Sequence, residues 1–323
     1  MSLFGGRKRS GHRTRILFAT DLHGADIVFR KFLNAIPVYE ADIAVLGGDL
    51  TGKSIVPVVE TDEGYAATVR GTEEVATDDE QLAHIVQLIR DTGQYPVTMT
   101  AAEEAELGRE AIDEKFAVAC LEQVGDWMER AAERLEPDGV PIYVTGGNDD
   151  YFSIEKVLDD APYIQNAEGQ VLELRPGLRM ISSGYGNQTP WKCPRDITEE
   201  ELAEKIEAMA SQLSEPRAAI FNLHVPPLGS GLDICPKLDT SVYPPRPMVG
   251  EVAAVGSAAV RDSIARFAPM LSLHGHIHEA PGVCELGPTT AVNPGSEYAQ
   301  GVLRTAVIDI QGGEVAAAQL LTA

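Results

Sequence analysis

The sequence is poor in cysteine and has no long apolar run. Its four cysteines have no paired spacing, which argues against a disulfide framework and against a zinc site built from cysteines; they are Cys120, Cys193, Cys235 and Cys284. A reducing, cytoplasmic compartment is therefore expected. No apolar run approaches the roughly 18 residues that cross a membrane, and no signal-type stretch follows the basic N-terminus, so no membrane partner is expected.

Basic residues are also few. The chain has 26 Lys and Arg against 49 Asp and Glu, a formal net charge of −23. A field of that sign repels phosphate backbones, so long nucleic acids are not expected as partners, and a nuclease would need a basic groove. The charge favours solubility or adaptation to salt. A small phosphorylated ligand remains compatible with it, because bound metal ions can invert the field locally.

Short apolar runs alternate with helical patterns through most of the chain. Strands are expected at 15–20, 42–46, 141–145, 179–183, 218–223 and 270–273, and further short β runs at 282–286, 289–292, 302–310 and 314–320. Helices are expected at 25–36, 77–90, 111–135, 198–213 and 251–267. This order predicts an α/β protein in which helices cover sheets.

One domain is expected over 15–323, after a disordered tail at 1–14. Residues 53–110 interrupt the alternation with a β-hairpin at 53–71, the helix at 77–90 and a polar stretch, and we interpret them as an insertion. The insertion is a candidate lid and equally a candidate contact of a homo-oligomer, because the edge strands of a hairpin can pair with a partner.

Metal-capable side chains follow the expected strands at the points where they end. Because ligands of open α/β sheets bind beyond the carboxyl ends of strands, we expect these side chains to converge on one crevice. Mixed Asp, Asn and His ligands without Cys suit Mn, Fe, Zn or similar divalent ions. Seven are too many for one tetrahedral zinc and suit two ions that share a carboxylate. The seven are Asp21, His23, Asp49, Asn148, His224, His276 and His278.

The segments that carry these residues resemble a known family. ATDLHG, GGDLTG, GGNDD, NLHVPP and HGHIH, in this order between Asp21 and His278, are similar to the five motifs of the calcineurin-like metallophosphoesterases. The GGND form and the insertion after GGDLTG most resemble the Icc-related predicted phosphoesterases of archaea and bacteria. The resemblance implies a four-layer α/β-β/α sandwich of two mixed sheets flanked by helices.

The resemblance also implies a reaction and a role for each ligand. A hydroxide bridging two divalent metal ions would attack phosphorus in line and hydrolyse a phosphodiester, in a small nucleotide-like or other small phosphorylated substrate. A phosphomonoesterase is the close alternative, and a metal-bound interaction module without catalysis is another. The first metal would be bound by Asp21, His23 and His278, the second by Asn148, His224 and His276, and both by Asp49.

Asn148 and Asp149 are the candidate catalytic residues, and two alternative roles are open for His274. Many family members carry a His, which assists the leaving group, where this chain has Asp149. An Asp with an ordinary pKa of roughly 4 is ionised at neutral pH and cannot donate a proton, although it could orient a histidine or a water molecule. His274 is not needed by the metals, and it either satisfies a backbone group or contributes to substrate binding or proton transfer.

Two loops are candidates for substrate contact. Residues 184–194 are rich in turn formers, and Asn187 and Thr189 could donate to a phosphate oxygen; the alternative is a purely structural loop. Residues 226–248 form a long proline-rich segment that is either a lid or an exposed connector.

Overall fold

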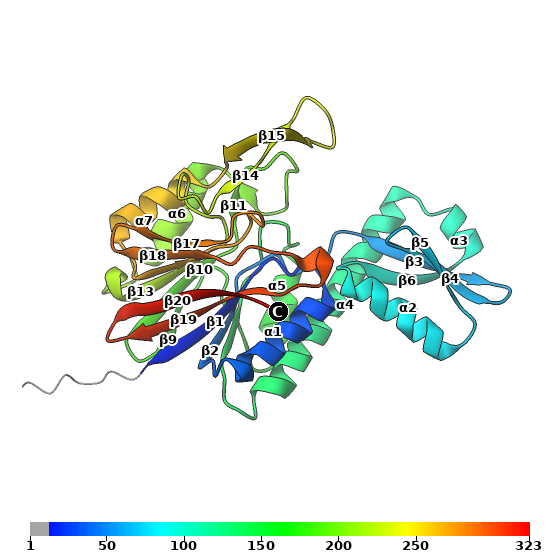
Figure 1. Ribbon diagram of the computed structural model, residues 1–323, viewed down its shortest axis with the longest axis horizontal. Helices are drawn as coiled ribbons and strands as arrows, with labels where there is room; N and C mark the ends of the chain where they lie inside the picture. Colours follow the sequence, from blue (N-terminus) through cyan, green and yellow to red (C-terminus); the bar gives the residue numbers. More distant parts are fainter. Residues whose placement is uncertain (1–12) are drawn as a thin grey trace, which may run out of the picture.

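Two six-stranded mixed sheets form the centre of the protein (Figure 1), in a computed structural model that describes residues 13–323. In spatial order the first sheet consists of β20 (Glu314–Thr322), β19 (Arg304–Gln311), β1 (Thr14–Ala19), β2 (Ile43–Leu46), β7 (Ile142–Val144) and β8 (Ile164–Asn166). The second consists of β17 (Gly282–Leu286), β18 (Thr289–Asn293), β16 (Leu271–Leu273), β13 (Ala219–Leu223), β10 (Leu178–Ser183) and β9 (Val171–Arg175). The strands that matter for the site, β1, β2 and β7 in one sheet and β13 and β16 in the other, are parallel to their neighbours in this set.

Strand β1 shows why these segments are apolar at every position. Its side chains Leu17 and Ala19 pack among the helices on the outer face of the first sheet. The alternate side chains Ile16 and Phe18 pack between the two sheets. A strand that is covered on both faces needs apolar residues throughout, because successive side chains point to opposite faces.

Helices cover the outer face of each sheet, and this confirms the expected four-layer α/β-β/α sandwich. On the first sheet lie α1 (Asp26–Val38), α4 (Arg109–Leu135) and α5 (Ile154–Asp160). On the second lie α6 (Glu199–Ala210) and α7 (Ala258–Phe267). Helix α6 begins with a capping box, in which Thr198 accepts from the backbone N–H of Glu201 and the Glu201 carboxylate accepts from that of Thr198.

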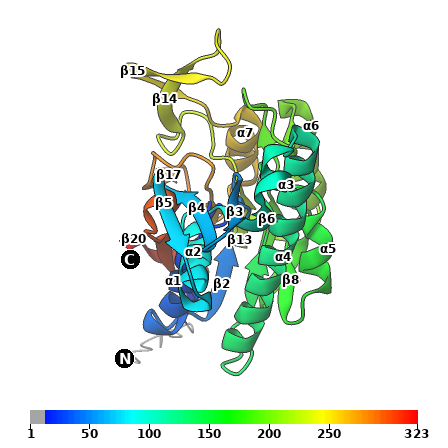
Figure 2. The ribbon, with the colours of Figure 1, turned by 90° about the vertical axis from the view of Figure 1, so that its right-hand side faces the viewer.

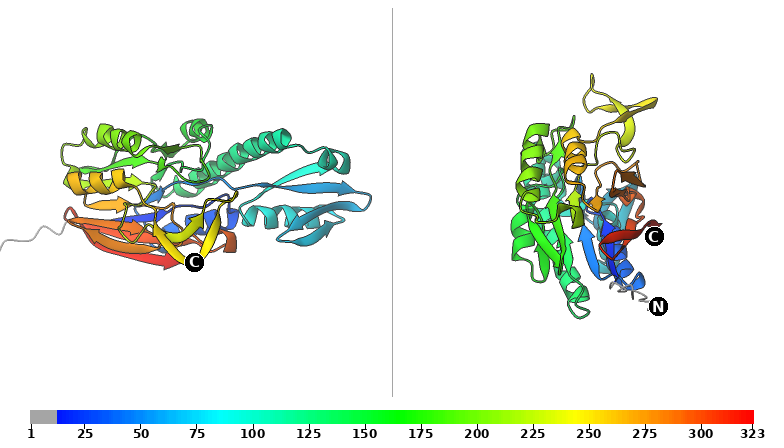
Figure 3. Two further views of the ribbon diagram at one scale, coloured as in Figure 1. Left: turned by 90° about the horizontal axis from the view of Figure 1, so that it is seen from above. Right: turned by 90° about the vertical axis from the view of Figure 1, so that its left-hand side faces the viewer.

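A third sheet, formed by residues of the expected insertion at 53–110, extends from one end of the sandwich (Figures 1 and 3) and faces the viewer in Figure 2. Its spatial order is β5 (Thr72–Ala76), β4 (Gly64–Val69), β3 (Ile55–Thr61) and β6 (Tyr95–Thr100), and its helices are α2 (Asp79–Asp91) and the short α3 (Ala101–Ala105). It has a small core of its own, in which Val58 and Ile89 are fully buried. As for the expected tail at 1–14, residues 1–12 lie outside the described residues and β1 begins at Thr14.

One expected helix is partly wrong, and one expected loop contains strands. The helix predicted at 251–267 begins only at Ala258, because residues up to Ala254 belong to β15 (Arg246–Ala254). This strand pairs with β14 (Ile234–Asp239) in a protruding hairpin, so the segment 226–248 contains β14 and the start of β15 (Figure 1). The β-branched Val249 and Val252 beside Gly250 favour a strand over a helix there. Within residues 13–323 no helix is long and apolar enough to span a membrane.

Candidate metal centre

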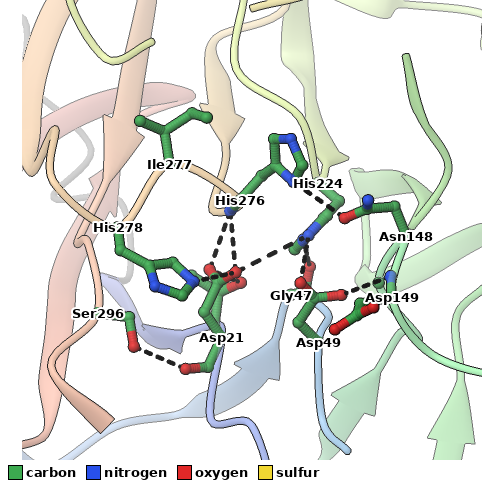
Figure 4. Close-up of polar contacts among 12 residues, drawn as sticks. Asp21, Gly47, Asp49, Asn148, Asp149, His224, His276, Ile277, His278 and Ser296 are labelled. Atoms are coloured by element: carbon green, nitrogen blue, oxygen red, sulfur yellow. Dashed lines mark hydrogen bonds and ion pairs between the residues drawn. The ribbon is translucent and has the colours of Figure 1, made fainter. Parts of the chain in front are cut away.

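The seven candidate ligands lie together at the carboxyl ends of five strands. Ligands from both sheets meet at one edge of the sandwich, where the parallel strands of each sheet end (Figure 4). In chain order, Asp21 and His23 follow β1, Asp49 follows β2, Asn148 follows β7, His224 follows β13, and His276 and His278 follow β16. The structure therefore brings together the residues that the sequence places at separate strand ends.

These side chains form two adjacent groups. Within each group the ligand atoms lie within 4.8 Å of one another; the groups are Asp21, His23 and His278, and Asp49, His224 and His276. Asp49 Oδ2 lies 3.4 Å from His224 Nε2 and 3.6 Å from His23 Nε2, so this carboxylate lies between the two groups. Asn148 Oδ1 lies 2.9 Å from His276 Nδ1 and adds an oxygen to the second group.

The ring of His224 shows that the donor set fits a cation. Its Nδ1 lies 3.0 Å from the carbonyl oxygen of Gly47, which can only accept, so Nδ1 carries the proton. Its Nε2 is buried and has no hydrogen-bond partner among residues 13–323, yet it faces the Asp49 carboxylate. A positive charge is needed between this nitrogen and the carboxylate. Without a metal it is a proton, because Asp49 outweighs burial and raises the pKa of His224 to about 9, and a divalent cation could take its place.

Four of the seven candidate ligands have a backbone conformation that residues other than glycine rarely adopt. The φ angles are 54° at Asp21, 42° at His23, 50° at Asp49 and 63° at His276, all in the left-handed region. Such conformations cost of order 1–3 kcal/mol each and persist where the surrounding structure imposes them, typically at functional sites. Their concentration at one crevice indicates a site that the fold builds at the expense of local backbone stability.

Close backbone approach also shapes the centre, and glycine permits it. A Cβ atom on Gly147 would lie 2.0 Å from Asp49 Oδ1, and one on Gly275 would lie 2.3 Å from Asp21 Oδ2. Any larger residue at either position would displace a candidate ligand. The glycines of GGND and HGHIH are therefore explained by the two carboxylates that lie against them.

Burial keeps two of the histidines in the neutral form that a metal ligand needs, whereas neighbouring carboxylates outweigh burial and raise the pKa of His224 to about 9 and that of His278 above its ordinary value, so a metal would displace protons from these two rings. Burial lowers the pKa of His23 to about 3 and that of His276 to about 4, so both rings are neutral at pH 7. Burial opposes ionisation of Asp21, but the hydrogen bond with His278 and the charges of His224 and His278 together outweigh it and lower the pKa of that carboxyl. His224 likewise outweighs the effect of burial on Asp49 and lowers its pKa.

A second layer of polar groups orients Asn148. Its Nδ2 donates to Asp196 Oδ1 at 2.9 Å, which turns its Oδ1 towards His276. The other Asp196 oxygen accepts from the backbone N–H of Thr189 at 3.0 Å and from its hydroxyl at 2.5 Å. Asp196 belongs to β12 (Asp196–Ile197), which pairs with β11 (Gly186–Asn187). Thr189, expected as a substrate contact, therefore lies behind Asn148 and acts through Asp196.

The other two expected substrate residues also have partners within the protein. Asn187 Nδ2 lies 3.4 Å from the carbonyl oxygens of Val255 and Gly256. His274 is fully buried, with Nε2 2.7 Å from the Ser272 hydroxyl and Nδ1 2.7 Å from the carbonyl oxygen of Leu223. Both ring nitrogens thus have partners within the protein, which is the arrangement expected if His274 satisfies backbone groups, and a contribution to substrate binding or proton transfer stays a prediction.

Sequence reasoning missed Asp150, which is fully buried one residue beyond Asp149. Its carboxylate accepts from the backbone N–H groups of Leu50, Thr51 and Gly147 at 2.8–2.9 Å and from the Thr51 hydroxyl at 2.6 Å. These donors come from the segments after β2 and β7, so Asp150 joins the loop of Asp49 to the loop of Asn148. Nothing in a single sequence distinguishes it from Asp149, since the two are adjacent carboxylates.

Asp149 lies at the open side of the centre and has a cationic partner that the sequence did not reveal. Its carboxylate is within 4.8 Å of ligand atoms of His23 and Asp49 and accepts a hydrogen bond from Lys53 Nζ. The ring of Tyr298 lies 4.7 Å from that of His23, centroid to centroid. Tyr298 also lines a groove of about 340 Å³ beside His278.

Comparisons with known proteins agree on the fold. No protein-family model matches the chain. Over 171 residues, 52% of this chain, it is 28% identical to the uncharacterized protein MJ1162 of Methanocaldococcus jannaschii and covers 68% of it. One solved crystal structure has a TM-score of 0.57 at 17% identity and covers 96% of this chain, with 99% of its own chain matched. The crystal structure of TT1561 of Thermus thermophilus has a TM-score of 0.54 at 13% identity, covering 91% of this chain and 94% of that one. In its motifs the chain resembles the calcineurin-like metallophosphoesterases, and its fold is the α/β-β/α sandwich that this resemblance implies.

Proposed function

We propose that the protein is a phosphoester hydrolase that depends on two divalent cations. The observation that carries the proposal is the convergence of two groups of ligands on Asp49, whose carboxylate lies 3.4 Å from the buried Nε2 of His224. The first cation would be bound by Asp21, His23 and His278, the second by Asn148, His224 and His276, and both by Asp49. Cations bound there would neutralise phosphate charge and acidify water, which is the chemistry that hydrolysis of a phosphate ester needs.

The residues of the chain prepare this centre by fixing its carboxylates. The Asp21 carboxylate accepts from the backbone N–H of His276 at 3.0 and 3.1 Å and from the Thr20 hydroxyl at 2.8 Å. The Asp49 carboxylate accepts from the backbone N–H of Asp149 at 3.0 Å. These donors orient the oxygens before any ligand arrives, so little reorganisation accompanies binding.

A small phosphodiester is the substrate that we propose. The net charge of −23 repels anions, and a diester carries one negative charge at neutral pH where a monoester carries nearly two. The motif resemblance to Icc-related sequences points the same way. A long nucleic acid would bring many phosphates against the same acidic surface, which disfavours it.

The test measures metal content and hydrolysis on one sample. We expect two metal ions per chain after loading with Mn²⁺, and cleavage of bis(p-nitrophenyl) phosphate in preference to p-nitrophenyl phosphate. Asp49→Ala should lose both metal and activity, by at least roughly 100-fold in kcat. Asp62→Ala, an exposed carboxylate in the hairpin turn of the third sheet, is the matched control and should change neither. Bound metal without cleavage of either ester would refute the hydrolase and leave a binding module; cleavage of the monoester alone would refute the diester.

A further inference from the structure

Lys53 places a positive charge at the mouth of the metal centre. It follows the GGDLTG motif directly and contacts the Asp149 carboxylate through Nζ. The Lys53 side chain is 47% exposed and that of Asp149 is 26% exposed, so the pair borders solvent on one side and the centre on the other. An ammonium group has three N–H donors, and Asp149 takes one of them. The remaining donors are available to a ligand that enters from solvent.

The third sheet fixes the backbone of Lys53. The N–H of Gly52 donates to the Tyr95 hydroxyl at 2.7 Å, and the N–H of Tyr95 donates to the carbonyl oxygen of Ser54 at 3.0 Å. A Cβ atom on Gly52 would lie 2.1 Å from the carbonyl oxygen of Gly93, so the two backbones are in close contact. The segment that carries Lys53 is therefore held on both sides, and its side chain starts from a fixed point.

Electrostatics keeps this amine charged. Desolvation favours the neutral amine, but the carboxylates of Asp49 and Asp149 outweigh it and raise the pKa of Lys53 above its ordinary value. Two other cations in the surroundings are already engaged. Arg195 is buried and contacts Glu155 and the carbonyl oxygen of Asp150, and Arg304 contacts Glu297 at 2.9 Å.

We propose that Lys53 binds a non-bridging phosphate oxygen of the substrate, and that Asp149 is the residue that positions it. The inference rests on the proposed function and adds to it a recognition residue outside the metal ligands. A bare carboxylate at Asp149 would repel an arriving phosphate, whereas the ion pair presents its ammonium donors to it. Together, Lys53 and Asp149 thus allow the acidic mouth of the metal centre to bind a phosphate.

Replacing Lys53 should lower kcat/KM much more than replacing Asp149. Lys53→Met should lower kcat/KM by roughly 10- to 100-fold, because it removes a charge-assisted contact and leaves Asp149 unpaired beside the phosphate. Asp149→Asn should cost only a few-fold, since the ammonium remains. The double variant should regain roughly 3- to 10-fold over Lys53→Met, because the repelling carboxylate is gone. Lys53→Arg, which keeps the charge, should retain most of the activity.

Three further readouts separate this role from a structural ion pair. The inhibition constant of inorganic phosphate, and its dissociation constant measured by calorimetry on Mn²⁺-loaded protein, should both rise about 10-fold in Lys53→Met. Metal content per chain and Tm should stay at the wild-type values. The matched control is Lys156→Met, which breaks the exposed Lys156–Asp160 pair on α5 and should leave every quantity unchanged.

Each outcome supports or overturns one of the two proposals. If wild type binds metal but cleaves neither ester, the proposed function fails, and phosphate affinity still decides the role of Lys53. If wild type is active and Lys53→Met has unaltered kcat/KM and phosphate affinity, the role of Lys53 is overturned. Equal losses in Lys53→Met, Asp149→Asn and the double variant, accompanied by a lower Tm or by loss of metal, would also overturn it, because that pattern describes a pair that only supports the fold.

Discussion

Replacing Asp150 by Ala should destabilise the protein strongly and disorganise the metal centre. The carboxylate accepts four hydrogen bonds, and its removal leaves three buried N–H groups and one hydroxyl without their acceptor. At about 1 kcal/mol for each bond the loss is about 4 kcal/mol. Burial raises the pKa of this carboxyl, and relief from that desolvation offsets part of the loss, so we expect about 3 kcal/mol. Asp150→Asn should cost roughly 2 kcal/mol, because its amide group places donors against donors.

Urea unfolding followed by circular dichroism measures this cost, and metal content measures its consequence. Because Asp150 joins the loop of Asp49 to that of Asn148, the Ala variant should also bind less metal under conditions where it is folded. Asp160→Ala is the control, because it removes an exposed carboxylate of the same type nearby in sequence. A cost below about 1 kcal/mol for Asp150→Ala would refute the reasoning, since it would mean that water satisfies the four donors.

Two further predictions concern the polar surroundings of the centre. Thr189→Val removes a hydroxyl that donates to Asp196, so Asp196 orients Asn148 less firmly. The affinity for Mn²⁺, measured by calorimetry, should fall roughly 10-fold. An unchanged affinity would contradict a role of Thr189 in orienting Asn148. Burial raises the pKa of Glu168 from 4.5 to about 7, although the N–H of Gly184 donates to it, so the folded state resists ionisation and its stability falls as pH rises between these values. In urea unfolding, the free energy of unfolding of Glu168→Gln should therefore rise by about 1–3 kcal/mol relative to that of wild type as the pH goes from about 5 to about 8. If the free energies of unfolding of the two proteins change in parallel with pH, this prediction is refuted.

The sequence predicts the sandwich and the convergence of ligands because both follow from local patterns. A run such as RILFA is apolar at almost every position only when both faces of a strand are covered, as they are for β1. Parallel strands end at the same edge, so a polar residue after each run is enough to place Asp21 near Asp49. The motif resemblance then supplies the order of the layers, which periodicity alone does not determine.

Contacts that depend on tertiary geometry were not predictable in the same way. Lys53 and Asp149 are 96 residues apart, and nothing in either segment indicates the pair. Asp150 differs from Asp149 only in which way its side chain points, a property of the turn after β7. The β14–β15 hairpin was missed because the helical pattern of α7 continues in sequence into Val252, although cross-strand pairing with Cys235–Pro236 decides the outcome.

Helix α4 determines what the third sheet can do mechanically. The helix is 27 residues long, about 40 Å, and its buried residues begin only at Cys120. The helix contacts β3 and β6 of the third sheet, for example through Phe116 on Tyr95, and the buried residues of its second half pack in one core with α1, α5 and the first sheet. A continuous helix resists bending, because a kink breaks its internal hydrogen bonds. We therefore expect the third sheet to move together with the body, as a wall beside Lys53, and not to swing over the metal centre as a lid.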